Sequence, residues 1–181
     1  LSLMKDDDAK KELEYDIKEM TAMLNSYVSF VRGETPETIE NIQLNNLIDN
    51  ICKNLDRKKY EITESYSRKI DTSGRPLQIK RAIQNILDNA IRYASKIHID
   101  VSANNDECFI SISDNGPGIP EKNYEDVFKP FFTLDPSRNK LKGESGLGMT
   151  ISRDIIRSHG GDIKLSPSSI GGLKTVINLP L

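Results

Sequence analysis

Apolar side chains in the stretch 79–94 recur at the three- and four-residue spacing of a helix with one buried face. The apolar positions are Ile79, Ala82, Ile83, Ile86, Leu87, Ala90, Ile91 and Ala94. Beside this face, Asn85, Asn89 and Arg92 stand at i, i+4 and i+7 and project along one line. Because asparagine is a mediocre helix former, two in register indicate a use other than packing. The stretch therefore predicts a central helix with a core face and a chemical face.

Other patterns predict the elements around this helix. Period-two alternation predicts strands over 40–44, 60–65, 96–102, 107–113, 162–165 and 173–179, and helical spacing predicts helices over 44–55 and 146–158. Asn104-Asn105-Asp106 and Gly171-Gly172 indicate the turns of two hairpins. The fold class that follows is α/β (α+β), a two-layer sandwich whose mixed, mainly antiparallel sheet is covered on one face by three helices.

The amino-terminal segment predicts a long helix of a different kind. Between Asp6 and Arg32 there is neither Pro nor Gly, and a heptad seam runs through Leu13, Ile17, Met20, Leu24, Tyr27, Val28 and Val31. Such a stripe pairs with another helix, from this chain or from a second copy; a helix packed on its own domain is the alternative. Gly33 and Pro36 end the helix, so we expect domains at 1–33 and 34–181.

Composition narrows the functional classes. The 181 residues are 36% hydrophobic and 29% charged, which suits one globular domain plus a smaller unit. A net charge of -2 without a clustered basic face argues against binding of nucleic acid. Cys52 and Cys108 lack metal or disulfide spacing, so we expect a reducing compartment. No stretch has the length of a membrane-spanning helix, and the amino terminus lacks a signal-peptide pattern.

A carboxylate followed by a glycine-rich turn ends the predicted strand 107–113. Asp114 precedes Asn-Gly-Pro-Gly, and Gly116 and Gly118 would let the backbone lie against a flat ring. A carboxylate accepts a hydrogen bond from the exocyclic amine of adenine, where guanine has a carbonyl, so Asp114 predicts selection of adenine. Taken by itself, this segment is better explained as a tight turn.

A second glycine-rich block, 143–149, leads into the predicted helix 146–158. Its backbone N–H groups and the helix dipole suit a phosphate chain. It is neither a P-loop nor a dinucleotide fingerprint, because it lacks a following Lys-Ser/Thr and a preceding strand.

A phosphate chain commonly shares a Mg²⁺ ion with one protein side chain. Because Mg²⁺ prefers oxygen ligands, Asn89 is favoured as that side chain. The polar stretch 133–142 indicates a lid whose cations reach the phosphates, or whose charges are only solvated.

Taken in order, these blocks resemble the ATP-binding catalytic domain of sensor histidine kinases. Residues 85–94 resemble its N box, 114–118 its first glycine box, 128–132 its F box and 143–149 its second glycine box. The resemblance implies nucleotide contacts from Asn85, Asn89, Arg92, Tyr93, Asp114, Gly116, Gly118, Ile119, Phe131, Arg138, Ser145, Gly146, Leu147, Gly148 and Met149. It also implies catalytic roles for Asn85 and Asn89, with Asn89 holding Mg²⁺. Glu144 and Met149 depart from the pattern, where a small residue and Leu are common.

The same resemblance implies a biological setting. Mg-ATP would phosphorylate a histidine, and the phosphoryl group would pass to an Asp on the receiver domain of a response regulator. Residues 1–32 resemble the end of the dimerisation hairpin of a homodimer, and the acceptor histidine would lie upstream of them. His98 is expected on a strand surface and His159 at a helix end, so we expect no acceptor in this sequence. The domain would be cytoplasmic, anchored in a bacterial inner membrane through segments outside this sequence.

Two other functions remain possible from the sequence. Gyrase-, chaperone- and mismatch-repair-type ATPases resemble this helix but carry a Glu general base at the position of Asn85, which cannot accept a proton at neutral pH. A module that senses ATP without transferring phosphate is the second alternative. A purely structural protein is disfavoured, because packing does not require this set of residues together: Asn85, Asn89, Asp114, Gly146 and Gly148.

Overall fold

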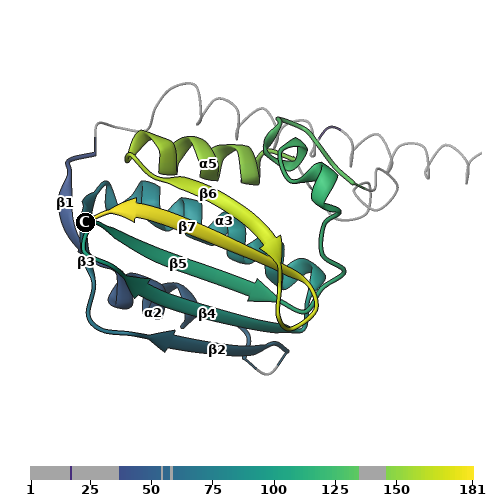
Figure 1. The fold of residues 1–181 in the computed structure, drawn as a ribbon, viewed down its shortest axis with the longest axis horizontal. Coiled ribbons are helices and arrows are strands. Elements are labelled where there is room, and N and C mark those ends of the chain that lie inside the picture. Colours follow the sequence, from purple (N-terminus) through teal and green to yellow (C-terminus); the bar gives the residue numbers. More distant parts are fainter. Residues whose placement is uncertain (1–16, 18–36, 54, 58, 135–145) are drawn as a thin grey trace, which may run out of the picture.

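The computed structural model describes residues 17, 37–53, 55–57, 59–134 and 146–181. Its centre is a five-stranded sheet in the order β2-β4-β5-β7-β6 (Figure 1). The strands are β2 (Glu61–Tyr66), β4 (Lys96–Ala103), β5 (Glu107–Asp114), β6 (Asp162–Pro167) and β7 (Leu173–Pro180). Strand β2 runs parallel to β4 and the other pairs are antiparallel. The predicted mixed, mainly antiparallel sheet is confirmed.

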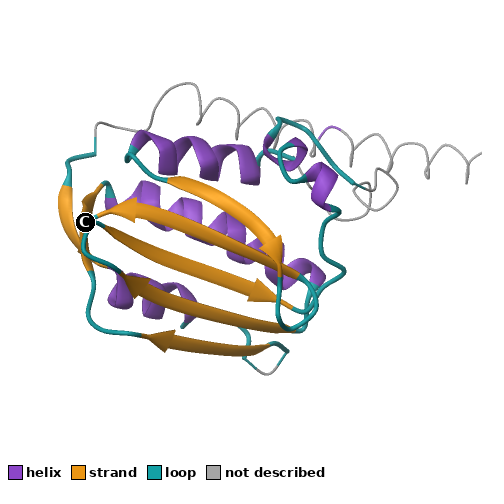
Figure 2. Cartoon of the chain, in the orientation of Figure 1, coloured by secondary structure: helices purple, strands orange, loops and turns teal. Residues whose placement is uncertain are grey.

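Helices cover one face of this sheet, as Figure 2 shows. They are α2 (Leu44–Cys52), α3 (Pro76–Tyr93) and α5 (Gly148–Ser158). On α3 the apolar stripe is buried, with Ile79, Ala82, Ile83, Ile86, Leu87 and Ala90 at most 5% exposed. Each large aliphatic side chain buried in this way contributes about 1.5–3 kcal/mol. The predicted two-layer sandwich and its central helix are both confirmed.

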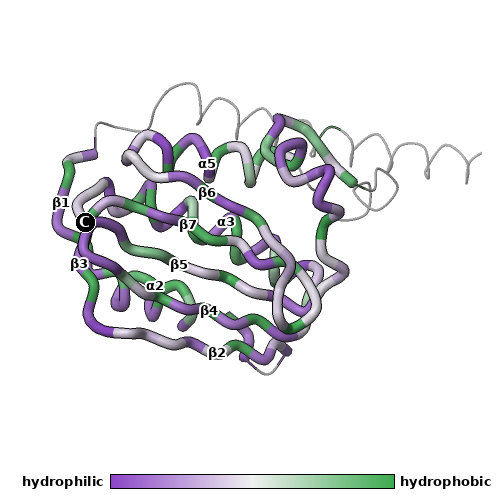
Figure 3. The backbone as a smooth tube through the Cα atoms, in the orientation of Figure 1, coloured by the Kyte–Doolittle hydropathy of each residue, from purple (hydrophilic) through white to green (hydrophobic). Residues whose placement is uncertain are grey.

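The central strands alternate between a core face and an outer face, visible as alternating colours along the tube in Figure 3. Ile97 and Ile99 of β4 pair with Asp114 and Ile112 of β5 on the side of the helices. On the opposite face, His98 Nδ1 lies 2.8 Å from Thr63 Oγ1. His98 is therefore a strand-surface residue, as the sequence predicts. A register slip of one residue would turn the isoleucines outward, so burial fixes the register.

The structure also contains elements that the periodicity does not predict. Strand β3 (Asp71–Gly74) pairs with β1 (Glu40–Gln43) in a two-stranded sheet. Its sequence is polar, but Thr72 is 3% exposed and donates a hydrogen bond to Pro180 O at 2.7 Å. Two 3-10 helices, η1 (Glu121–Asn123) and η2 (Asp126–Phe128), follow the first glycine block. They are too short for a helical period to appear in the sequence.

The amino-terminal helix predicted over residues 6–32 lies outside the described residues, except for Ile17, which is helical. The polar stretch after Leu134 and the first half of the second glycine block also lie outside them. Within the part that is described, no helix combines the length and the apolar character needed to cross a membrane.

Groups distant in sequence fix the start of α3. Its own N-cap residue, Arg75, forms no side-chain cap. Instead, the Glu37 carboxylate accepts the N–H groups of Leu77 and Gln78 at 2.5 and 3.2 Å. His159 Nε2 accepts the Arg75 N–H at 3.0 Å, while its Nδ1 lies 2.7 Å from a carbonyl of the last turn of α5. His159 therefore caps α5, as predicted, and also orients the first turn of α3.

Two arginines join α5 to the start of β6. Arg153 and Arg157 each place Nε 3.1 Å from Asp162 Oδ1. Although burial opposes ionisation, hydrogen bonds from both arginines and from the Ile163 N–H lower the pKa of Asp162 to about 2. The carboxylate is thus stabilised in its charged form by the folded structure.

This lowered pKa predicts a specific loss of stability in acid. The stabilisation by Asp162 is present above its ordinary pKa of 3.8 and is lost as pH falls toward the folded value of about 2. We expect Asp162→Asn to reduce the free energy of unfolding at pH 7, with a difference from the natural protein that shrinks as pH falls from about 5 to 3. Urea unfolding across this range measures it. A difference independent of pH would contradict this assignment.

Candidate functional site

The second half of α3 and the start of α5 bring two of the predicted blocks together. The Asn85 Nδ2 donates a hydrogen bond to Gly148 O at 3.3 Å. One turn further along α5, Ser152 is fully buried and its Oγ lies 2.9 Å from Gly148 O and 3.0 Å from Ala82 O. The helices are therefore tied at the point where α5 begins.

The N-terminus of α5 has no side-chain cap, and Leu147 is its N-cap residue. The backbone N–H groups of a first helical turn have no partner within the helix, and together with the helix dipole they favour an anion. Gly148 contributes no side chain at this position, where an added Cβ would point toward Asn85 Cβ and Cγ. The start of α5 beside Asn85 is therefore suited to a phosphate group.

Asn89 lies one helical turn beyond Asn85 on α3. Its side chain is half-buried, and no hydrogen bond to another described residue uses its amide. Among the described residues, no group of three or more His, Cys, Asp or Glu side chains could hold a metal ion. A divalent cation here would therefore depend on the Asn89 oxygen together with oxygens of the ligand and water, which fits the coordination habits of Mg²⁺. Arg92 and Tyr93, on the last turn of α3, are exposed.

Asp114 ends β5 and is held in place by backbone donors. The side chain is 7% exposed, and Oδ1 accepts the Gly116 N–H at 2.8 Å and the Leu173 N–H at 3.2 Å. Neither of these bonds uses Oδ2, which leaves that oxygen as an acceptor for a ligand. Gly172 closes the other side, with its N–H on Asp114 O at 3.0 Å. A Cβ on Gly172 would lie 2.2 Å from Asp114 Oδ1, so only glycine fits there.

The F-box segment meets the second glycine block at Phe131. Its N–H donates to Gly146 O at 3.1 Å, and a Cβ on Gly146 would lie 2.8 Å from Phe131 Cα. Phe131 itself has φ +63° and is 57% exposed. A non-glycine residue in this region costs about 1–3 kcal/mol, so the neighbouring contacts must hold it there.

The other predicted site residues fall into separate groups. Gly116 lies against the end of α3, where an added Cβ would be 3.0 Å from Tyr93 O, and Gly118 faces Gly172. The side chains of Ile119, Leu147 and Met149 pack on or within the core. Arg138 and Ser145 lie outside the described residues.

Sequence reasoning missed two residues that shape this region. One is Gly172, which was interpreted only as part of a hairpin turn. The other is Asn115, whose Oδ1 accepts the N–H groups of Ser95 and Lys96 at 3.0 and 2.9 Å and joins the end of β5 to the start of β4. An Asn inside a turn is a signal for bonding to backbone, but it does not reveal which backbone.

The fold is a two-layer sandwich, with a candidate anion site at the start of a helix. A family model described as histidine kinase-, DNA gyrase B-, and HSP90-like ATPase matches residues 74–181. The chain belongs to this family.

The comparisons also identify similar proteins. Sensor histidine kinase GtrS of Pseudomonas aeruginosa is 29% identical over 99% of this chain and 37% of its own length. Sensor histidine kinase CpxA of Escherichia coli K12 is 28% identical over 94% of this chain and 39% of its own length. The solved catalytic domain of histidine kinase ThkA has a TM-score of 0.70 and 26% identity, over 79% of this chain and 97% of that one. The chain thus spans less than two fifths of the length of these two curated relatives.

The close approach of Gly172 to Asp114 predicts a strong effect of one methyl group. We expect Gly172→Ala to lower the free energy of unfolding by about 1–3 kcal/mol, because the carboxylate and the Gly116 N–H must move. Gly148→Ala is the matched control: its Cβ would lie 3.8 Å from Asn85 Cβ, an ordinary contact, and we expect a change within about 0.5 kcal/mol. Chemical denaturation measures both. If Gly172→Ala lowered the free energy of unfolding as little as Gly148→Ala does, glycine would not be required at position 172.

Proposed function

We propose that this chain is the ATP-binding part of a sensor histidine kinase, which transfers the γ-phosphoryl group of Mg-ATP to a histidine of a dimerisation helix. The observation that carries the proposal is the contact of Asn85 with Gly148 at the start of α5. It joins the side chains of the N box to the backbone donors of the second glycine box. Membership of the ATPase family supports the use of ATP.

Asp114 recognises the base in this proposal. Its Oδ1 is occupied by two backbone N–H groups, which orient the carboxylate and leave Oδ2 to accept the exocyclic amine of adenine. Gly116, Gly118 and Ile119 lie beside the base, and Tyr93 presents a ring edge. Because guanine carries a carbonyl at this position, two acceptors would face each other and GTP would be rejected.

The phosphate chain lies at the start of α5. Backbone N–H groups of 146–149 bind it, and Asn85 and Arg92 position phosphate oxygens and water. Asn89 supplies a protein ligand to Mg²⁺. Bound Mg²⁺ neutralises charge on the phosphate oxygens during transfer. Phe131, Arg138 and Ser145 complete the set of proposed contacts.

Asn85 favours a kinase over a hydrolase. Its amide donates to Gly148 O, and an amide cannot accept a proton from water at neutral pH. A neutral imidazole needs no strong base, because it already presents a lone pair. Phosphoryl transfer to histidine therefore requires only in-line positioning and neutralisation of charge, which this site supplies.

The remaining parts of the proposal concern the whole protein. Residues 1–33 end a dimerisation hairpin that forms a homodimer, and residues 34–181 form the catalytic domain. The phosphoryl group passes to the receiver domain of a response regulator. The domain works in the bacterial cytoplasm, and membrane anchoring depends on segments outside this sequence.

Nucleotide titration tests the roles of Asp114 and Asn89. We expect ATP to bind at least about tenfold more tightly than GTP, and Mg²⁺ to strengthen the binding of ATP. Asn89→Ala should remove the Mg²⁺-dependent part of the affinity, whereas Gln84→Ala, at an exposed position on the same helix, should leave it unchanged. Isothermal calorimetry with and without Mg²⁺ measures these affinities. Comparable affinities for ATP and GTP would remove the adenine contact from Asp114.

A mixing experiment tests the reaction itself. We expect Mg-ATP and this chain to label an added acceptor-bearing helical hairpin with acid-labile phosphate, and Asn89→Ala to reduce the rate at least about a hundredfold. ATP hydrolysis without the acceptor should be slow. Binding of ATP without transfer would favour an ATP-sensing module, and rapid hydrolysis that is lost on Asn85→Ala would favour a hydrolase.

A further inference from the structure

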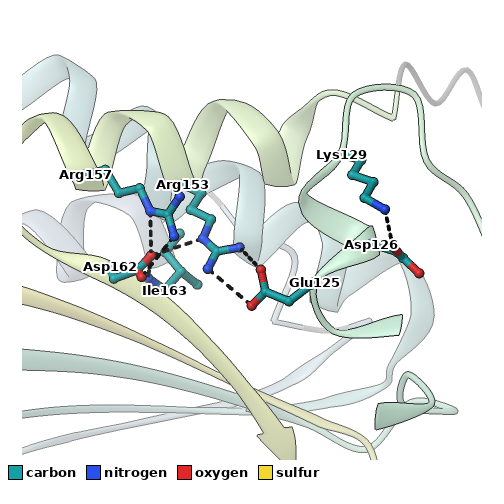
Figure 4. A network of polar contacts seen from close by, with 7 residues as sticks. All are labelled: Glu125, Asp126, Lys129, Arg153, Arg157, Asp162 and Ile163. Carbon is teal, nitrogen blue, oxygen red and sulfur yellow. Dashed lines mark hydrogen bonds and ion pairs between the residues drawn. The ribbon is translucent and has the colours of Figure 1, made fainter. Parts of the chain in front are cut away.

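Arg153, in the second turn of α5, contacts three residues in two other parts of the chain, and Figure 4 shows its contacts with Glu125 and Asp162. Its Nη1 and Nη2 lie 2.7 and 3.3 Å from the two carboxylate oxygens of Glu125. Its Nε lies 3.1 Å from Asp162 Oδ1, and the guanidinium stands 4.3 Å from the centroid of the Phe128 ring. The Arg153 side chain is only 12% exposed, so it is largely enclosed by its neighbours.

The chemistry of these contacts needs arginine. A planar guanidinium can bind a carboxylate with two parallel hydrogen bonds while one face lies on an aromatic ring, which a lysine ammonium cannot do. The hydrogen bond from Arg153 lowers the pKa of Glu125, so the carboxylate stays charged. Glu125 is 79% exposed, however, and an ion pair so exposed adds little to global stability. The contacts therefore mainly fix geometry.

The contacts of Arg153 position the segment that reaches the second glycine block. Glu125 is the residue before η2, and Phe128 is its last residue. Phe131 follows Phe128 by three residues and donates its N–H to Gly146 O. The segment 125–131 is thus attached to the α5 region twice, once at Arg153 and once at Gly146. Phe131, at the second of these points, has a strained positive φ, and such a conformation relaxes when its supports are removed.

We propose that Arg153 is a positioning residue for the nucleotide site: it holds η2 against α5 and thereby keeps Phe131 on Gly146, so that the turn before α5 is preorganised for phosphate. A site held in its binding geometry before the ligand arrives loses less entropy on binding. This inference rests on the proposed function, because the ligand is the nucleotide of that site.

Arg157 provides a matched control on the same helix. It bonds Asp162 through Nε and Nη2 at 3.1 and 3.2 Å, but it forms no hydrogen bond with Glu125 and no ring contact with Phe128. Arg153→Gln and Arg157→Gln each remove one positive charge and one partner of Asp162. Only the first releases η2.

Two measurements test the proposal. We expect Arg153→Gln to raise the Kd for Mg-ATP about tenfold in calorimetry, and Arg157→Gln to leave it within about twofold. In the nucleotide-free protein, hydrogen exchange of the Phe131 amide should accelerate in Arg153→Gln and not in Arg157→Gln. Glu125→Gln, at an exposed position, should also raise the Kd and accelerate exchange of the Phe131 amide. The double variant Arg153→Gln/Glu125→Gln should differ little from Arg153→Gln alone.

The outcomes separate this inference from the proposed function. If the natural protein binds no Mg-ATP, the proposed function fails, and the Phe131 exchange still decides whether Arg153 holds this turn. If it binds Mg-ATP and Arg153→Gln matches Arg157→Gln in both readouts, the positioning role is wrong. If Arg153→Gln does not fold, Glu125→Gln decides: unchanged affinity and unchanged Phe131 exchange overturn the proposal.

Discussion

The burial of one face of α3 is the constraint on which the rest of the structure depends. Its apolar stripe packs on the sheet with almost no exposure, which fixes the rotation of the helix about its axis. Successive helical residues differ by about 100° in direction, so a shift of one residue would bury Asn85 and Asn89 among isoleucines at a large cost. Burial of the apolar stripe thus determines the direction in which the side chains of Asn85 and Asn89 point, although neither residue belongs to the core. The same 18-residue helix therefore supplies both a face of the core and two side chains of the candidate site.

Backbone contacts, more than side chains, shape the rest of the site. Asp114 is oriented by the N–H groups of Gly116 and Leu173, and Phe131 meets Gly146 through a main-chain hydrogen bond. Gly146 and Gly172 are required because a Cβ would overlap the backbone or the carboxylate it approaches. Such contacts change little when surface residues vary, since they depend on chain path and on the absence of a side chain.

The difference between periodic burial and contacts of distant residues explains which features the sequence could predict. The helix 79–94 and the alternating strands appear in the sequence because their signals are local and periodic. Strand β3 does not, because its polar residues become a strand only by pairing with β1. The contacts of Asp114 with Leu173 and of Arg153 with Glu125 join residues 59 and 28 positions apart, respectively, and no spacing rule indicates them. The sequence indicates which residues belong to the candidate site, whereas the contacts that support them appear only in the tertiary structure.

Helices α3 and α5 run antiparallel to each other, and hydrogen bonds join them at several points along their length. His159 meets Arg75, Ser152 meets Ala82, and Gly148 meets Asn85, so each step backward along α5 matches a step forward along α3. In the proposed function, the phosphate chain is bound by this helix pair, whereas adenine is bound at the end of β5. A displacement of α5 along α3 would therefore move the phosphate donors relative to Asn89 while leaving Asp114 in place. In that proposal, affinity for the base and geometry at the phosphates depend on different parts of the fold, so they would vary independently.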